Sequence, residues 1–465
     1  MTTQRHWFVV TVRFVTDMAL FIGAYMIAMF LRFSNEWGTF LYQYSVSIIA
    51  GGLTLSCGLY MSGMYNLERR KSRLFKRILL FFLIVCVAVI FMLGISYITR
   101  ITVIGRGVMF IGAILAFIFV VMHYFILLKY QETNRERVAM IVGSEIDEID
   151  VANLVNFAKF RLNLVGVIKY RNYTLKRDFK VLGDVEDMVK ISEKKKLSRI
   201  ICTNRNISDS TLYSKFCQLR YMGVIVMPEI GVYEEFYQMC PLTQVTPEWI
   251  LNASTSPHMF YIRNIKRIFD VIISITGLIF LGPLMLIGMI GTKLTSKGDV
   301  FYKQIRLGQF GAPIKIIKLR SMRIDAEVNG VQWSCKDDPR VTKWGNILRK
   351  YRIDEIPQLI NILKGDMSFV GPRPERPEFM VELEKEIPLF KERLLIQPGL
   401  TGWAQVNYPY CNTIDDSKRK LEYDLYYVKH MSLFLDLFII LDTLRIILSG
   451  GSKSSFKLKL EEYKV

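Results

Sequence analysis

The chain has 465 residues, a hydrophobic fraction of 51% and a formal net charge of +19 at pH 7. That length accommodates about two or three domains, and a mean hydropathy of +0.25 is high for a soluble protein. The seven cysteines and four histidines are scattered without zinc-ligand spacing, which excludes a zinc finger and favours free thiols in a reducing compartment.

Four long apolar segments account for the high hydropathy. They are approximately Trp7–Phe33, Phe40–Tyr65, Ile78–Ile98 and Val108–Leu128. Each is near or above the roughly 20 residues that cross a bilayer as a helix. The first is too long, and too closely followed by the others, to be a removable signal peptide. We predict four transmembrane helices within residues 1–130.

The loops between these segments indicate their orientation. Asn66–Arg77 holds six Lys or Arg residues, whereas Ser34–Thr39 holds none and Thr99–Gly107 holds two. Basic loops remain in the cytoplasm, so we expect both termini there. The positive charge suits anionic lipids and phosphorylated substrates. Nucleic acid is disfavoured because no basic stripe with interleaved aromatics lies outside the membrane-proximal segments.

A small parallel α/β domain is predicted over residues 137–250, because short apolar runs alternate with helical patterns. The turn after the first run reads Gly143-Ser144-Glu145 and lacks the second and third glycines of the dinucleotide-binding fingerprint. We therefore expect a degenerate Rossmann-like domain with a structural or regulatory role. The expected strands are Arg137–Gly143 with its glycine turn, Leu164–Ile168, Arg199–Cys202 and Val224–Met227, with a helix at Val151–Phe160.

A fifth apolar run, Val271–Thr292, has Gly282-Pro283 close to its middle. Proline removes a backbone donor and clashes with the preceding turn, so a bend is expected there. Both flanks are basic, which favours the same side of the membrane for both ends. We predict a re-entrant helix over residues 266–293 that breaks at Gly282 and Pro283. The alternative is a kinked fifth crossing, which would place residues 293–465 outside the cell. The flanking cations are Arg263, Lys266, Arg267, Lys293, Lys297, Lys303 and Arg306.

Two adjacent carboxylates, Asp354 and Glu355, precede a short amphipathic pattern that Gly365 is placed to end. Pro357 is tolerated only near a helix start, which predicts Asp354 close to the N-cap. The positive end of that helix would face both carboxylates and any bound phosphate. A plain helix cap is the competing interpretation of Asp354.

Cations gather in several neighbouring motifs. Arg373 lies in the proline-flanked loop Gly371-Pro372-Arg373-Pro374, which presents a guanidinium for bidentate phosphate contacts. Pro398–Gln405 is a second stiff loop, which carries the indole of Trp403. The residues that we predict to bind phosphate or nucleotide are Arg306, Lys318, Arg320, Arg349, Arg373 and Arg376.

The last apolar stretch, Leu433–Leu448, contains Asp436, Asp442 and Arg445. These charges make a crossing costly, so we expect an interfacial helix whose polar side faces the rest of the domain. Asp17 is a further charge inside a predicted span, and the sequence names no partner for it.

Together these segments resemble the bacterial sugar transferase family of polyprenyl-phosphate glycosylphosphotransferases, over about residues 259–450. The amino-terminal regions look like its large branch, which initiates exopolysaccharide or O-antigen synthesis. Gly282-Pro283 departs from the Ser-Pro that small relatives often carry. The matching motifs are Lys266-Arg267-x-Phe269-Asp270, Asp354-Glu355-x-Pro357-Gln358-Leu359, Lys364-Gly365-Asp366-Met367-Ser368, Pro372-Arg373-Pro374 and Thr401-Gly402-x-Ala404-Gln405.

The resemblance implies a fold class and a location. The protein would be a multi-pass bacterial inner-membrane protein with a four-helix transmembrane bundle and the Rossmann-like cytosolic domain. Residues 259–465 would form a monotopic α/β catalytic domain built on the re-entrant helix. Both termini and the catalytic domain would be cytoplasmic, and a homodimer is expected.

The resemblance also implies a reaction. A sugar-1-phosphate, typically of glucose or galactose, would pass from a UDP-sugar to undecaprenyl phosphate with release of UMP. Asp354 would attack the β-phosphorus and carry the phosphosugar, while Glu355 would help to hold Mg²⁺. Arg349 and Arg373 would stabilise phosphate oxygens. A carboxylate is a competent nucleophile for phosphorus when cations neutralise the incoming charge.

Two alternatives remain open. A non-catalytic membrane sensor or scaffold of polysaccharide assembly would use the α/β domain for ligands and the C-terminal part for partners. A transferase that moves only the sugar would release UDP in place of UMP.

Overall fold

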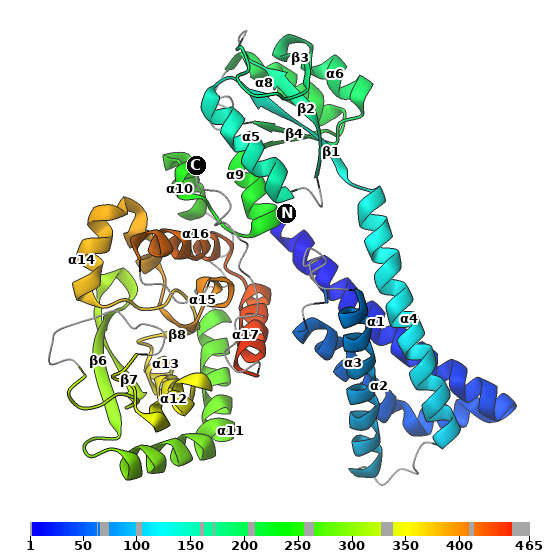
Figure 1. Ribbon diagram of the computed structural model, residues 1–465, viewed down its shortest axis with the longest axis vertical. Coiled ribbons are helices and arrows are strands. Elements are labelled where there is room, and N and C mark those ends of the chain that lie inside the picture. Colours follow the sequence, from blue (N-terminus) through cyan, green and yellow to red (C-terminus); the bar gives the residue numbers. More distant parts are fainter. Residues whose placement is uncertain are drawn as a thin grey trace. The chain divides into compact units, whose positions relative to one another are not determined.

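The structure is a computed structural model, and the chain forms two compact units, Met1–Glu229 and Ile230–Val465 (Figure 1). Several predicted features lie outside the described residues. They are most of the basic loop Asn66–Arg77, much of Thr99–Gly107, Arg263, and the domain limits at residues 259 and 465. The structure describes residues 2–62, 64–65, 74–98, 105–158, 162–170, 173–202, 210–254, 265–326, 338–408 and 413–448.

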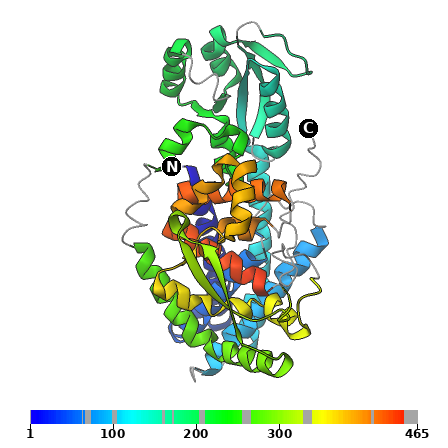
Figure 2. The same cartoon turned by 90° about the vertical axis from the view of Figure 1, so that its left-hand side faces the viewer.

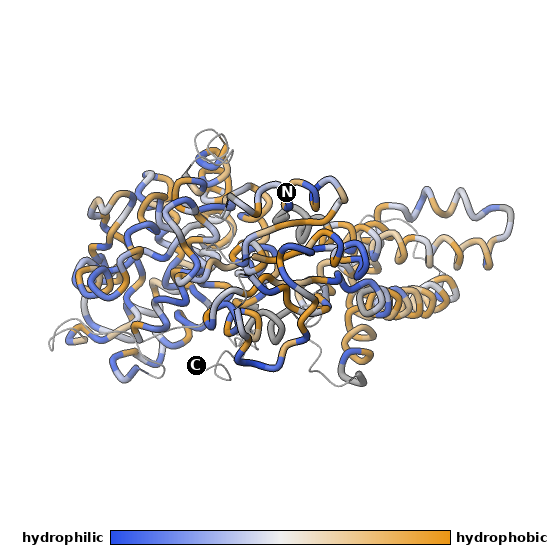
Figure 3. The backbone as a smooth tube through the Cα atoms, turned by 90° about the horizontal axis from the view of Figure 1, so that it is seen from above, coloured by the Kyte–Doolittle hydropathy of each residue, from blue (hydrophilic) through white to orange (hydrophobic). Residues whose placement is uncertain are grey.

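The first four helices confirm the four apolar segments. They are α1 (Thr2–Phe33), α2 (Trp37–Met61), α3 (Leu74–Ile98) and α4 (Arg106–Thr133). All four are long and apolar enough to cross a membrane. Their predominantly apolar colouring is visible on the right of Figure 3.

Small residues and one polar pair join these helices. A Cβ atom at Gly112 of α4 would lie 2.7 Å from the Tyr25 ring of α1, so the missing side chain lets this ring pack against the backbone of α4. The sequence named no partner for Asp17 of α1. In the structure its carboxylate is hydrogen-bonded to Nδ1 of His123 on α4, at 2.8 Å. The intramembrane charge therefore joins two spans of the bundle.

The middle of the chain forms a five-stranded parallel sheet in the order β3-β2-β1-β4-β5. This order is the first part of a doubly wound fold, as the strand–helix alternation predicts. Residues 138–142 of β1 are fully buried, which explains their unbroken apolar sequence. The elements are β1 (Glu136–Val142), α5 (Glu145–Ala158), β2 (Leu162–Lys169), β3 (Val181–Asp184), α6 (Met188–Lys195), β4 (Arg199–Cys202), α8 (Ser210–Tyr221) and β5 (Ile225–Pro228).

The turn between β1 and α5 is filled by the chain's own acidic side chains. The backbone N–H of Gly143 donates to Asp147 at 2.8 Å. Both carboxylate oxygens of Glu148 accept backbone N–H bonds, from Lys176 and Arg177. Carboxylates thus occupy the first turn of α5, where a dinucleotide fold would hold pyrophosphate.

The second unit is built around a β6–β7 hairpin, which Figure 2 shows in yellow-green, and a cluster of short helices. Its core includes Ile316, Leu348, Ile353, Leu359 and Ile362. The elements are α9 (Glu229–Val232), α10 (Pro247–Ser254), α11 (Lys266–Thr295), β6 (Phe301–Leu307), β7 (Pro313–Leu319), α12 (Lys343–Lys350), η7 (Ile353–Glu355), α13 (Gln358–Lys364), β8 (Ser368–Val370), α14 (Pro377–Glu386), η8 (Pro388–Leu395), β9 (Gly399–Thr401), α15 (Trp403–Asn407), α16 (Ile414–His430) and α17 (Leu433–Leu448).

Helix α11 corrects one detail of the sequence prediction. Its backbone stays helical from Lys266 to Thr295 with Pro283 inside it, so the expected break at Gly282 and Pro283 is wrong as an interruption of the helix. Figure 1 instead shows α11 turning sharply into two arms. A helix can lose the one hydrogen bond that proline removes and bend while the flanking turns keep theirs.

Most apolar side chains of α11 lie on the surface of the second unit. Phe280 and Leu294 are 78% and 80% exposed. The packed side is marked by small residues, since a Cβ atom at Gly291 would lie 2.3 Å from the Trp344 ring of α12. Helix α11 is the fifth helix long and apolar enough to cross a membrane. Its exposed face is therefore suited to a lipid environment.

Helix α17 has the predicted limits, and the charge in its first turn points into the protein. Asp436 is fully buried and pairs with Lys266 of α11 at 2.6 Å. Within the second unit, the segment before α11 is joined to α15, because Nε1 of Trp403 donates to the carbonyl of Gln238 at 2.8 Å. Trp403 is therefore a buried anchor of the second unit.

Candidate functional site

Asp354 and Glu355 lie in a 3₁₀ turn, η7, and not at the N-cap of the following helix. Arg352 adopts a left-handed conformation with φ of 57° and redirects the chain into this turn. Pro357 is the N-cap of α13, so the predicted position of Asp354 is wrong by one turn. The apolar spacing could not separate the two because a single 3₁₀ turn and a single α turn place these residues on the same face. Gly365 ends the helix with φ of 95°, as predicted.

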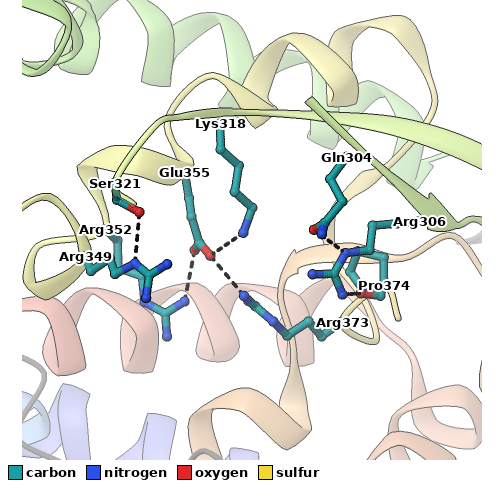
Figure 4. Close-up of polar contacts among 9 residues, drawn as sticks. All are labelled: Gln304, Arg306, Lys318, Ser321, Arg349, Arg352, Glu355, Arg373 and Pro374. Carbon is teal, nitrogen blue, oxygen red and sulfur yellow. Dashed lines mark hydrogen bonds and ion pairs between the residues drawn. The ribbon is translucent and has the colours of Figure 1, made fainter. Parts of the chain in front are cut away.

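Glu355 is surrounded by three cations (Figure 4). Its carboxylate contacts Arg352 at 2.9 Å, and Lys318 and Arg373 at 3.2 Å each. Burial raises the pKa of Glu355, but the charges of Lys318, Arg352 and Arg373 outweigh burial and hold that pKa well below its ordinary value. Glu355 is therefore the anionic centre of the cluster.

Asp354 has the opposite environment, although it is the next residue in the chain. It is 7% exposed, and its carboxylate makes no hydrogen bond or ion pair with any residue that the structure describes. Burial and then the charge of Glu355 raise its pKa, which Lys318 and Arg349 partly offset. Two neighbouring carboxyl groups whose environments push their pKa values apart are typical of a reacting pair.

The six predicted cations divide into two groups. Lys318 and Arg373 contact Glu355, and the charge of Arg349 acts on Asp354 while its Nε donates to Ser321 at 2.9 Å. The other three bind groups away from the carboxylates. These contacts are Arg306 to Gln304 at 2.8 Å and to the Pro374 carbonyl at 3.2 Å, Arg320 to the Ser296 carbonyl at 2.9 Å, and Arg376 to Glu378 at 3.4 Å.

Two residues that shape this site are not among the predicted site residues, although Arg352 was visible in the sequence as a cation just before the two carboxylates. Arg352 contacts Glu355 directly, and its spacing of three residues from an acid was the available signal. Arg393 donates to the carbonyl of Arg373 at 2.9 Å and pairs with buried Asp424 at the same distance. Burial raises the pKa of Asp424 to about 6 despite the charge of Arg393. No local pattern marks Arg393, because its partners are distant in sequence.

The site presents no closed cage for a metal ion. Within the described part of the chain, no group of three or more His, Cys, Asp or Glu residues could hold one. Glu355 already contacts three cations, whereas the carboxylate of Asp354 has none in contact. Mg²⁺ is commonly bound by one or two carboxylates together with substrate phosphates. Asp354 could bind Mg²⁺ in this way with a carboxylate oxygen. Glu355 could do so only when one of its three cations moves away.

Comparison with known proteins identifies the family. The pattern of the bacterial sugar transferase family matches residues 261–450. An exopolysaccharide production protein, PSS, of Rhizobium leguminosarum bv. phaseoli is 40% identical over 194 residues, which cover 40% of this chain and 96% of that protein. The chain belongs to the bacterial sugar transferase family. Every residue of the carboxylate–cation site lies inside the matched region.

Two longer relatives are similar to this chain over segments of comparable length. The UDP-N-acetylgalactosamine-undecaprenyl-phosphate N-acetylgalactosaminephosphotransferase of Aeromonas hydrophila is 43% identical over 186 residues, 40% of this chain and 44% of that protein. The UDP-glucose:undecaprenyl-phosphate glucose-1-phosphate transferase of Xanthomonas campestris pv. campestris is 38% identical over 198 residues, 41% of this chain and 40% of that protein. The similarity thus spans less than half of each longer relative.

Proposed function

We propose that this protein is a phosphoglycosyl transferase that moves a sugar-1-phosphate from a UDP-sugar to undecaprenyl phosphate and releases UMP. The observation that carries the proposal is the contrast between Asp354, which has no bound partner among the described residues, and Glu355, which holds three cations. The names of the relatives, which include undecaprenyl-phosphate sugar-phosphate transferases, support the acceptor and the reaction class.

In the proposed first step, a carboxylate oxygen of Asp354 attacks the β-phosphorus of the UDP-sugar. The bond between that phosphorus and the bridging oxygen breaks, and its electron pair leaves with UMP. In the second step, a phosphate oxygen of undecaprenyl phosphate attacks the same phosphorus and expels the Asp354 carboxylate. One site can thereby serve an aqueous donor and a lipid acceptor in turn.

The neighbouring residues have distinct proposed roles. Lys318 and Arg373 stabilise the oxygens of the transferring phosphate, since Glu355 holds both cations at the site. The charge of Arg349 favours the ionised form of Asp354. Bound Mg²⁺ would polarise the diphosphate and offset charge on the departing UMP. Glu355 would help to hold the ion once one of its three cations moves, and Asp354 offers a further carboxylate oxygen.

The other predicted cations act more indirectly. Arg306 is held by Gln304 and by the carbonyl of Pro374, so it supports the loop that carries Arg373. Burial lowers the pKa of Arg306 to about 10, and the charge of Glu375 opposes this shift. Arg320 and Arg376 remain candidates for nucleotide contacts at the edge of the site.

The membrane arrangement is part of the same proposal. Helix α11 would enter the cytoplasmic leaflet, bend and return, so that both termini and residues 293–465 stay in the cytoplasm with the UDP-sugar. Its largely exposed apolar face supports contact with lipid. A reporter fused after Val465 should be cytoplasmic, and an external signal would replace re-entry by a fifth crossing. We also propose a homodimer, which mass photometry of the purified protein tests.

The deciding experiment uses purified full-length protein with undecaprenyl phosphate and a panel of UDP-sugars. The expected result is UMP release with one preferred sugar. Release of UDP would establish a transferase that moves only the sugar. No nucleotide release with any donor, alongside retained ligand binding, would favour a sensor or scaffold.

A further inference from the structure

The start of α11 contacts the segments on either side of the carboxylate–cation site, the end of α13 and strand β8. Arg267 donates to the carbonyls of Ile362 and Leu363, at the end of the helix that follows Asp354 and Glu355. Asp270 accepts the backbone N–H of Phe369 at 3.0 Å. Phe369 belongs to β8, which leads directly into the loop of Arg373. The membrane helix is thus joined to both sides of the site.

A second, fully buried connection runs through three side chains from three different helices. Lys266 of α11 donates to Asp436 of α17 at 2.6 Å and to the hydroxyl of Tyr427 on α16 at 3.2 Å. The hydroxyl of Tyr427 donates to Asp436 at 2.6 Å, and the carbonyl of Val370 lies 3.2 Å from it as a second acceptor. Val370 is the last residue of β8.

Burial makes this arrangement strict. Asp436 and Tyr427 are completely buried, and Lys266 is 6% exposed. A buried charge that loses its partner is strongly destabilising, so the two charged groups hold one geometry. The pair thereby fixes the position of the Tyr427 hydroxyl next to the carbonyl of Val370 in β8.

We propose that Lys266, Asp436 and Tyr427 are positioning residues that set the register between the membrane helix α11 and the loop that carries Arg373. The inference rests on the proposed function. Loading of Asp354 needs Arg373 close to Glu355, which its ion pair at 3.2 Å provides, and a soluble UDP-sugar can follow a small shift of the loop relative to α11. The acceptor phosphate is anchored in the bilayer by its polyprenyl chain, so its approach to the loaded Asp354 depends on that register.

The test separates the two half-reactions in full-length protein reconstituted in lipid nanodiscs. Without acceptor, the burst of UMP reports loading of Asp354. Addition of undecaprenyl phosphate then reports transfer of the phosphosugar. For Tyr427→Phe we expect the burst rate to stay within about twofold of wild type and the transfer rate to fall about tenfold, the size of effect that loss of one positioned hydrogen bond has.

Tyr423→Phe is the matched control. Tyr423 lies one turn earlier on α16 and is also buried, but Glu422 and Arg419 are the charged groups that act on it. Both half-reactions should keep their wild-type rates in this variant. Hydrogen exchange of residues 371–376 should increase in Tyr427→Phe and not in Tyr423→Phe.

Lys266→Met is expected to destabilise the protein because Asp436 loses its charged partner. The double variant Lys266→Met with Asp436→Leu replaces the pair by apolar side chains and should recover thermal stability but not the transfer rate. Equal losses in both half-reactions of Tyr427→Phe, no loss in either, or recovery of transfer in the double variant would overturn the inference. Absence of a UMP burst in wild type would instead refute the proposed function, and this inference would fall with it.

Discussion

Two turns of the described chain, the first turn of α5 and the turn before α13, each carry neighbouring acidic side chains, and the partners of these acids differ. In the middle domain, Asp147 and Glu148 accept hydrogen bonds from backbone N–H groups. In the second unit, Glu355 pairs with three side-chain cations, whereas Asp354 makes no ion pair or hydrogen bond through its carboxylate with any described residue. Backbone partners close a turn, whereas side-chain cations beside a carboxylate that has no partner among the described residues leave a place for a phosphate.

Glu234 shows that cations alone do not define a reaction site. It contacts Lys429 at 2.7 Å and His430 at 3.2 Å, but Trp249 also donates to it at 2.6 Å. Both of its oxygens are therefore occupied. The distinguishing feature of the candidate site is the carboxylate of Asp354, which has no partner among the described residues and stands next to one that three cations contact.

The largest expected effect is that of Asp354→Asn. The amide keeps the shape of the side chain but cannot form the acyl phosphate, so turnover should fall by at least about 10⁴-fold, as for removal of a nucleophile. UMP release and mass spectrometry of the trapped adduct check this. Thermal stability should not decrease, because a buried charge without a bound partner is removed. Full activity in the variant would show that Asp354 only shapes the turn.

Glu355→Gln should have a smaller effect on turnover, of about 10²-fold, because the chemistry remains but three cations lose their common partner. The concentration of Mg²⁺ needed for half-maximal rate should rise. Titration of Mg²⁺ against the initial rate of UMP release measures both changes. An unchanged metal dependence together with a lowered rate would limit Glu355 to the organisation of Lys318, Arg352 and Arg373.

The part of the fold that follows from local pattern could be predicted from the sequence. The apolar spans became α1 to α4, the limits of α17 were correct, and Gly365 ended α13 as expected. Strand β3 was missed because four residues with a glycine carry too little periodicity. The 3₁₀ turn at Asp354 was missed because one turn of either helix type satisfies the same spacing.

Partners that are distant in sequence could not be predicted. Lys266 and Asp436 are separated by 170 positions, and Asp17 and His123 by 106. Asp17 and Asp436 were visible as charges inside apolar runs, but their partners are selected only by the packing of whole helices. The two acids of the site were found, whereas their pKa contrast depends on Lys318 and Arg373 arriving from other elements.

The occupied acid Glu234 gives a prediction about pH and stability. Burial raises its pKa, but the hydrogen bond and charge of His430 and the charge of Lys429 lower it to about 2. Because its folded pKa lies below the unfolded value, its stabilisation is complete above about pH 4.5 and is lost as pH falls toward 2. Glu234→Gln should therefore lower stability by up to roughly 3 kcal/mol at neutral pH, and less in acid. Thermal unfolding of wild type and variant between pH 3 and pH 7 tests this.

The smallest effect is expected in the middle domain. Asp147→Ala removes the acceptor for the Gly143 N–H and should cost about 1 kcal/mol, as for loss of a helix-capping side chain. Hydrogen exchange of residues 143–148 should increase, while the rate of UMP release per folded molecule stays unchanged. Asp147→Asn is the matched control, since its amide oxygen still accepts the bond and should retain most of the protection. A fall in UMP release with Asp147→Ala alone would mean that the two acidic turns are functionally connected, and the contrast between a structural and a reactive turn would no longer hold.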